Sequence, residues 1–110
     1  MPKVVDPKPR VQKNPEGYTG NINLFTRPIV RNNDGSKSTV LSMSFYDENT
    51  GKETLIPMVG HKNGRPAILS EKEAINLFRA TGKHLGKFDN PKDANKMAEK
   101  IHRQQEFYYG

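Results

Sequence analysis

Four cations recur at helical spacing near the end of the chain, and their pattern suggests a binding surface. Lys92, Lys96, Lys100 and Arg103 are separated by four, four and three residues, which places them on one face of a helix. Such a row either contacts phosphates or an acidic protein surface, or it is simply a solvated face. Glu99 is close to Lys96 and Arg103 along the helix and neutralises part of the row.

Three consecutive aromatic residues, Phe107, Tyr108 and Tyr109, follow this helix and are predicted to form a C-terminal tail over residues 107–110. Exposed aromatic side chains at a terminus reduce solubility unless they pack. They either cover the small core of the domain itself or anchor the chain on a partner, a role for which tyrosine is well suited. Tyr108 and Tyr109 are therefore candidate partner-binding residues.

Residues 1–16 contain four prolines and no apolar periodicity, which predicts an extended arm of polyproline type. One interpretation is a disordered tail. The other is a segment that becomes ordered on a neighbouring subunit, because proline lowers the entropy lost on docking. In that case Lys8, Arg10 and Lys13 are its candidate partner contacts.

Residues suited to catalysis or metal binding are scattered. His61, His84 and His102 have no second ligand at metal spacing, and the chain has no cysteine. The glycines match no phosphate-binding loop, and no nucleophile-elbow sequence occurs. The sequence therefore predicts a non-enzymatic protein without a metal or a cofactor.

Composition narrows the range of partners. The 110 residues carry a formal net charge of +6 and have a pI near 9.7, which suggests nucleic acid, but the charge is spread along the chain. Any nucleic-acid binding is therefore expected to be weak and non-specific. Mean hydropathy is −0.86, and no apolar run approaches the ~20 residues that span a bilayer, so no membrane partner is expected.

The elements that would position these residues begin with strands. Apolar and polar residues alternate at Ile22 and Leu24 within 17–30, throughout 39–46, and again in 53–59. Because proline donates no ladder hydrogen bond, Pro28 either places the first strand at a sheet edge or breaks it, and Pro57 places the last strand at an edge. Residues 32–36 predict a turn, and residues 60–66 predict a loop.

Two helices are expected. The first begins at Ser70, which forms a capping box with Glu73, and ends at Gly82. A short strand lies within 83–88, and the second helix begins after Asn90 and buries a stripe that ends at Ile101. The predicted fold is α+β: a small antiparallel sheet of three or four strands with two helices packed on one face, preceded by an extended N-terminal arm. The domain proper covers residues 17–106.

Several segments resemble a small domain of tailed phages and prophages. They are Asn14–Leu24, Asp34–Val40, Leu55–Val59, Thr81–Asp89 and Ile101–Gln105, so the resemblance covers residues 14–106. Members of that family occur alone or attached to larger phage proteins, including internal virion proteins and cell-wall-degrading proteins. The resemblance implies no catalytic residues. It implies a structural or virion-associated protein that is assembled in the host cytoplasm and binds other phage virion proteins or further copies of itself.

A second resemblance covers only some twenty residues. Leu85–Asp89, followed by a helix with Ala94 and Ala98, is similar to the end of plant ethylene-response-type DNA-binding domains, in which a three-stranded sheet packs on one helix. This pattern is also typical of strand-turn-helix packing in general, in which glycine permits a close approach. The alternative function is therefore a small DNA-binding module that acts on phage DNA or is delivered with it.

Overall fold

The computed structural model describes residues 13–31, 34, 37–38 and 41–109. Residues 1–12, with Lys8 and Arg10, and most of the expected turn at 32–36 lie outside this part. The predicted α+β class is confirmed. In chain order the elements are β1 (Val30–Arg31), β2 (Lys37–Ser38), β3 (Ser42–Asp47), β4 (Lys52–Pro57), β5 (Val59–Lys62), β6 (Arg65–Ile68), α1 (Glu71–Thr81), β7 (Gly86–Phe88) and α2 (Pro91–Tyr109).

The main sheet is antiparallel with the strand order β3-β4-β7, while β1-β2 and β5-β6 form separate pairs. Strand β4 is central, so the edge position predicted from Pro57 is wrong. The Leu85 N–H donates to the Leu55 carbonyl (2.7 Å), so the backbone groups of alternate β4 residues, Leu55 and Pro57 among them, face β7. Pairing of β4 with β7 ends at Leu55, so no strand lies opposite Pro57 on that side. A proline, which has no backbone N–H to donate, therefore costs no ladder hydrogen bond at this position.

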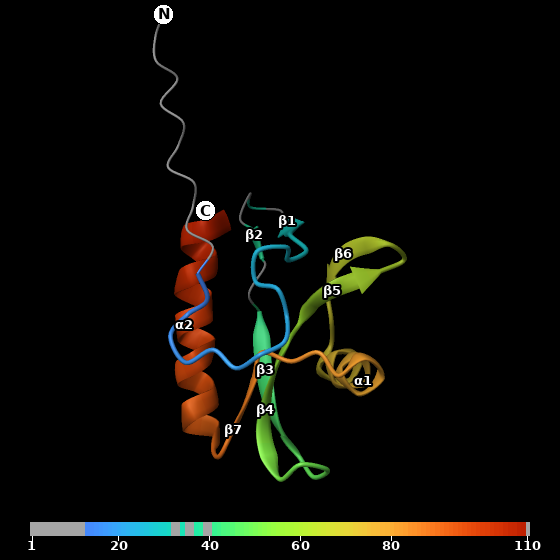
Figure 1. Cartoon of the computed structure of the whole chain (residues 1–110). Helices are drawn as coiled ribbons and strands as arrows, with labels where there is room; N and C mark the ends of the chain where they lie inside the picture. Colours follow the sequence, from blue (N-terminus) through green and yellow to red (C-terminus); the bar gives the residue numbers. More distant parts are fainter. Residues whose placement is uncertain (1–12, 32–33, 35–36, 39–40, 110) are drawn as a thin grey trace, which may run out of the picture.

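The core is divided by the sheet because neighbouring residues of a strand point to opposite faces. Leu55 contacts one buried cluster, and Ile56, which is 0% exposed, contacts the other. Helix α2 covers the Leu55 face and α1 covers the Ile56 face (Figure 1). The prediction that both helices pack on one face is therefore wrong. The first cluster contains Leu24, Leu55, Leu85, Met97 and Ile101, and the second contains Ile56, Leu69, Ala74 and Phe78.

The helix boundaries follow the predicted capping residues at three of four ends. The Glu73 N–H donates to the Ser70 hydroxyl (3.1 Å), the Ser70 N–H donates to the Glu73 carboxylate (2.9 Å), and Gly82 is left-handed at φ 71°. The Asp93 N–H donates to the Asn90 side chain (2.9 Å) at the start of α2. At its other end α2 continues to Tyr109, so residues 107–109 belong to the helix and not to the separate tail expected over 107–110; residue 110 lies outside the described part.

The segment before β1 is irregular, so the strand predicted within 17–30 is wrong except for Val30 in β1. Its apolar pattern still identifies a core residue, since Leu24 is only 1% exposed. Side chains replace the missing ladder: the Tyr18 hydroxyl donates to the Ile22 carbonyl (2.8 Å), and the buried Gln105 amide donates to the Leu24 carbonyl (2.6 Å). The segment lies along α2 in Figure 1.

Residues 60–66, expected to be a loop, contribute most of the β5-β6 hairpin. Its two turn residues both have positive φ, 53° at Asn63 and 76° at Gly64, as a type I′ turn requires. Pro66 lies opposite His61 in the hairpin. In antiparallel pairs hydrogen-bonded and non-hydrogen-bonded positions alternate, and the pair next to the turn, Lys62 and Arg65, is hydrogen-bonded. The His61 and Pro66 pair is therefore not hydrogen-bonded, and proline is tolerated there. An ion pair of 2.9 Å between Lys62 and Glu73 joins the hairpin to the start of α1.

Gly86 provides a stability test. Its φ is +144°, and an added Cβ would lie 2.7 Å from Cζ of Phe88. We expect Gly86→Ala to lower the free energy of unfolding by roughly 3 kcal/mol, because it adds a clash to backbone strain. Gly82→Ala is the control: it has positive φ but no atom within 4 Å of the added carbon, so it should cost about 1 kcal/mol. Equal urea midpoints for the two variants would contradict this packing.

Candidate functional site

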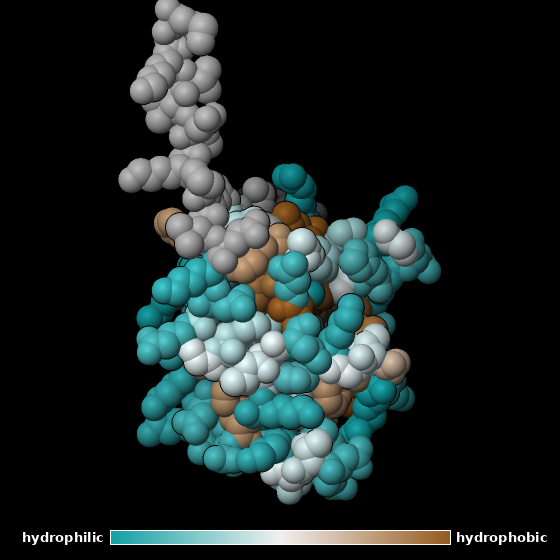
Figure 2. Space-filling model, in the orientation of Figure 1, coloured by the Kyte–Doolittle hydropathy of each residue, from teal (hydrophilic) through white to brown (hydrophobic). Residues whose placement is uncertain are grey.

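A groove of about 540 Å³ lies between the irregular segment, the β4-β5 junction and α1. Its floor is apolar, and apolar side chains gather between the irregular segment and β5 in Figure 2. Concave sites of this size with an apolar floor are the usual place for a ligand or a peptide to bind. The lining residues are Asn21, Ile22, Asn23, Thr26, Arg27, Pro28, Ile56, Pro57, Val59, Gly60, His61, Ala74, Leu77, Phe78, Thr81 and Lys83.

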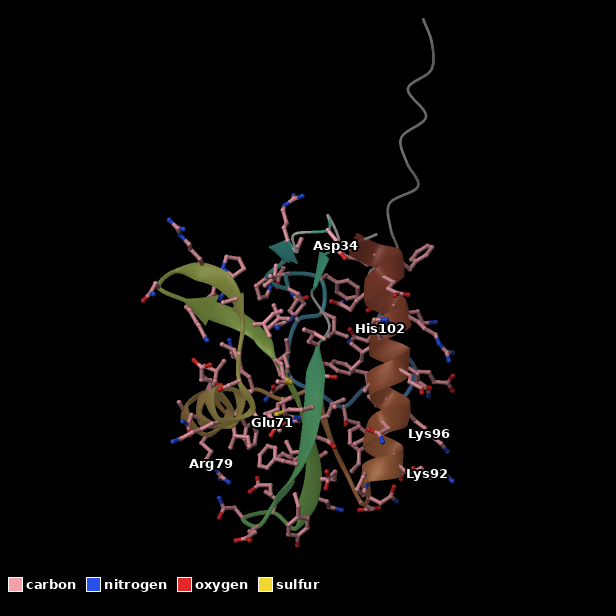
Figure 3. All side chains as sticks on the ribbon, turned by 180° about the vertical axis from the view of Figure 1, so that it is seen from behind. Asp34, Glu71, Arg79, Lys92, Lys96 and His102 are labelled. Carbon is pink, nitrogen blue, oxygen red and sulfur yellow. The ribbon has the colours of Figure 1, made fainter. Side chains whose placement is uncertain are left out.

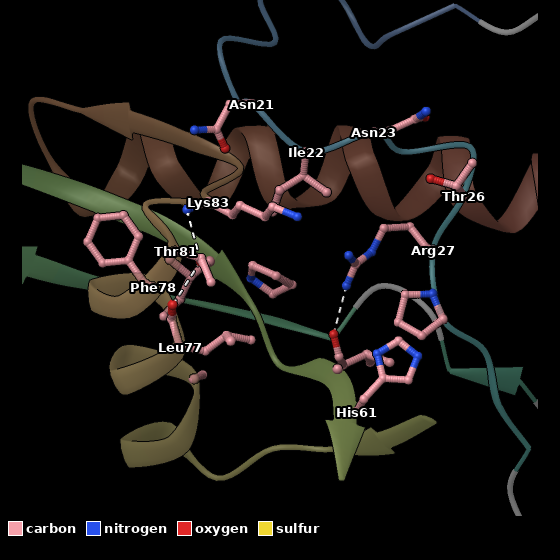
Figure 4. Close-up of a pocket in the computed structure, with 16 residues that line it drawn as sticks. Asn21, Ile22, Asn23, Thr26, Arg27, His61, Leu77, Phe78, Thr81 and Lys83 are labelled. Atoms are coloured by element: carbon pink, nitrogen blue, oxygen red, sulfur yellow. Dashed lines mark hydrogen bonds between the residues drawn. The ribbon is translucent and has the colours of Figure 1, made fainter. Parts of the chain in front are cut away.

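The groove lining is cationic, because it contains Arg27 and Lys83 but no Asp or Glu, and His61 adds an imidazole. The Arg27 guanidinium donates to the Val59 carbonyl (2.7 Å) and so fixes the irregular segment to the first residue of β5. In Figure 4 the exposed Lys83 side chain starts next to the end of α1 and extends across the groove, and Arg27 and His61 lie on the opposite side. The groove therefore presents positive charge above an apolar floor.

Asn21 holds one wall of the groove in place. Its N–H donates to the His84 carbonyl (3.0 Å), its side-chain oxygen accepts from the His84 N–H (2.8 Å), and its amide donates to the Gly82 carbonyl (2.9 Å). One asparagine thus makes the contacts that a neighbouring strand would make. It joins the irregular segment to the end of α1, next to Lys83.

His84 is half-buried behind this wall. Its ring packs edge-on against Phe78, with 6.4 Å between centroids, and its buried Nδ1 has no hydrogen-bond partner among the described residues. Burial lowers the pKa of His84 below the ordinary 6.5, and the nearby Lys87 charge lowers it further. His84 is therefore a neutral packing residue at neutral pH.

The cations predicted on α2 lie on its exposed side, away from the groove. Figure 3 shows Lys92 and Lys96 pointing away from the sheet. Lys100 donates to the Glu16 carbonyl (3.3 Å), and Arg103 lies 3.9 Å from the Glu99 carboxylate. Two of the four cations therefore already contact the chain itself.

The other predicted contact residues that the structure describes, Lys13 and Tyr108, are not part of the groove lining either. Tyr108 is partly buried and packs edge-on against Phe25 of the irregular segment at 5.1 Å between ring centroids, while Phe107 is 76% exposed. The Lys13 carbonyl accepts a hydrogen bond from Gln104 (2.7 Å), which holds the end of the expected arm on α2. Tyr109 ends the helix, and its side chain lies outside the described part.

Sequence reasoning missed the groove because three segments that are distant along the chain form it. The pair that bonds Arg27 to Val59 is 32 residues apart, and Asn21 is 63 residues from its partner His84. Helical spacing places Leu77 on one apolar stripe with Ala74 and Phe78, which indicates a core position and not a groove wall. Leu77 is 43% exposed, whereas Ala74 and Phe78 on the same stripe are buried.

Within the described residues, no group of three or more His, Asp or Glu side chains could hold a metal ion. None of the helices described is long and apolar enough to cross a membrane. Comparison with known proteins found no matching family model, no matching curated protein and no matching solved structure.

The buried His84 predicts a pH dependence of stability. The unfolded chain takes up a proton at the ordinary histidine pKa of 6.5, but the folded chain resists until lower pH, so the unfolded state binds more protons in between. The free energy of unfolding should therefore fall as pH drops from 7 to 5. Glu73, whose pKa is lowered to about 2 chiefly by its hydrogen bond to Lys62, stays ionised over this range.

Urea titrations at several pH values, with His84→Gln beside wild type, provide the measurement. His84→Gln should remove most of the slope, and His61→Gln, at an exposed position, should retain it. An unchanged slope in His84→Gln would show that another group causes the dependence.

Proposed function

We propose that the chain is a non-enzymatic virion or virion-associated protein of a tailed phage, which binds another virion protein during assembly or genome delivery. The groove supports this proposal most strongly, because it is open, apolar at its floor and cationic at its rim. Leu77, 43% exposed at one wall, is a candidate anchor for a partner side chain. The sequence resemblance to phage domains supports the part of the proposal that places the chain in a phage particle.

The chemistry of the lining favours recognition over catalysis. A nucleophilic hydroxyl needs a base within hydrogen-bond distance, but the Thr81 hydroxyl donates to the Leu77 carbonyl (2.8 Å). General acid and base catalysis is commonly performed by groups placed near one another with shifted pKa values. The lining offers His61, two cations and amides instead, which are groups suited to holding an acidic ligand.

The alternative function, a DNA-binding module, is supported by the exposed row on α2. Lys92 and Lys96 face away from the sheet, and Lys100 and Arg103 follow on the same helix (Figure 3). Internal contacts of Lys100 and Arg103 reduce the charge available for phosphates. This surface therefore favours weak binding that follows charge rather than sequence.

The proposed function predicts that the protein copurifies with mature particles. We expect mass spectrometry of density-banded particles, from a phage or prophage that encodes this chain, to detect it after a high-salt wash. A host protein of similar size and charge is the control and should be removed by the wash. Detection in the lysate but not in particles or in assembly intermediates would contradict the proposal.

The surface of α2 predicts the behaviour towards DNA. Binding to duplex DNA should have the same affinity for unrelated sequences, and the slope of log affinity against log salt should not exceed about 4 in magnitude, since at most four phosphates are neutralised. Fluorescence anisotropy at increasing salt measures both. Lys96→Glu should weaken binding, whereas Lys72→Glu, on α1, should not. Sequence-specific binding that persists at high salt would favour the DNA-binding module instead.

A further inference from the structure

We infer that the groove binds a short, extended, acidic peptide segment of the partner protein, with one apolar side chain on the groove floor and carboxylates beside Arg27 and Lys83. This inference rests on the proposed function and specifies the chemistry of the partner. It is carried by the charge of the lining, the exposed apolar wall and the edge of β5.

Charge complementarity identifies the acidic character of the segment. Arg27, His61 and Lys83 are basic, and no lining residue is acidic. The exposed Lys83 ammonium extends across the groove (Figure 4). A carboxylate bound there would lie in a positive field above a floor of low polarity, where charge interactions are stronger than in water.

The apolar side chain of the segment would pack against Leu77. The spacing of α1 directs Ala74, Leu77 and Phe78 toward one side, but only Ala74 and Phe78 are buried in the core. Leu77 reaches the wall of the groove and remains 43% exposed. Leu77 is the large apolar side chain of the lining that keeps the most exposed surface, so a partner side chain packed against it would bury apolar area that the fold leaves open.

The size of the groove limits the segment to a few residues. Ala74 and Thr81 mark the extent of α1 along the wall, and seven helical steps of ~1.5 Å give about 10 Å. An extended chain advances ~3.3 Å per residue, so three or four residues fit. A segment of this length can hold one apolar residue between two acidic ones.

The edge of β5 favours an extended backbone for this segment. Lys62 and Arg65 flank the turn and share the hydrogen bonds of that pair, so the N–H and carbonyl of His61 point away from β6. The Leu69 N–H donates to the Met58 carbonyl (2.6 Å), so the Met58 carbonyl faces β6. Since alternate residues face alternate sides, the backbone groups of Val59 and His61 face away from β6. Arg27 already binds the Val59 carbonyl on this outer edge, and no described residue bonds the His61 backbone there. Strand addition uses edges of this kind.

A single-stranded nucleic acid fits the lining less well. Such ligands stack their bases on exposed aromatic side chains above a basic groove. The lining has one aromatic ring apart from histidine, Phe78, which is 8% exposed and is packed in the second cluster. The floor is aliphatic, as a leucine-like side chain requires.

The test is a titration of the isotope-labelled chain, followed by amide chemical shifts. The probe is the capped peptide acetyl-Glu-Leu-Glu-Leu-amide, with acetyl-Lys-Leu-Lys-Leu-amide as the matched control and oligothymidine as the nucleic-acid probe. We expect saturable shifts at Gly60, His61 and Leu77 with the acidic peptide, and at least tenfold weaker binding of the basic one. Saturable groove shifts with oligothymidine at equal or higher affinity, equal binding of both peptides, or no saturable shift with the acidic peptide would overturn the inference.

Two pairs of variants locate the contacts. Lys83→Glu should weaken the acidic peptide about tenfold, while Lys72→Glu, on an exposed part of α1 outside the lining, should not. Leu77→Ser should also weaken binding of the acidic peptide about tenfold, whereas its control, Ala80→Ser at another exposed position of α1, should not. Equal affinities within either pair would overturn the assigned contact. If the Lys83→Glu and Leu77→Ser double variant still associates with particles, the peptide inference fails and the proposed function stands.

Discussion

The burial of β4 on both faces is the constraint on which the rest of the structure depends. Leu55 and Ile56 are consecutive and nearly inaccessible to solvent, so each face of this strand needs its own cover. Helix α2 supplies one cover and α1 the other, which divides a small apolar content into two clusters. Leu77 belongs to neither cluster and stays exposed at the wall of the groove.

Features that depend on neighbours within a few residues were predicted well from the sequence. The capping box of Ser70 and Glu73, the left-handed Gly82 and the cap at Asn90 all form as expected, because each needs only contacts within one helical turn. The apolar positions that α2 buries up to Ile101 were likewise correct, since helical spacing determines its inner side. The buried Gln105 lies beyond the predicted stripe.

Features that depend on distant partners were not predictable in the same way. Alternation at Ile22 and Leu24 indicated a strand, but Gln105 and Tyr18 satisfy the backbone there without one. The opposite error occurred at the β5-β6 hairpin, where a loop was predicted in place of two strands. The Asn63-Gly64 pair is a strong signal for a tight hairpin turn. The nearby Gly60 and Pro66 favoured a loop over the whole segment. The groove needs three such distant segments at once, so no local pattern marks it.

The contacts that fix the irregular segment have a consequence for folding during synthesis. Gln105 and Gln104, near the end of α2, bind carbonyls that are 81 and 91 residues earlier in the chain. The β3-β4 ladder and the β5-β6 hairpin with α1 can form from local contacts while the chain is still emerging from the ribosome. The Leu24 cluster must wait for the last turns of α2, so the nascent chain carries an uncovered apolar face until translation has passed them.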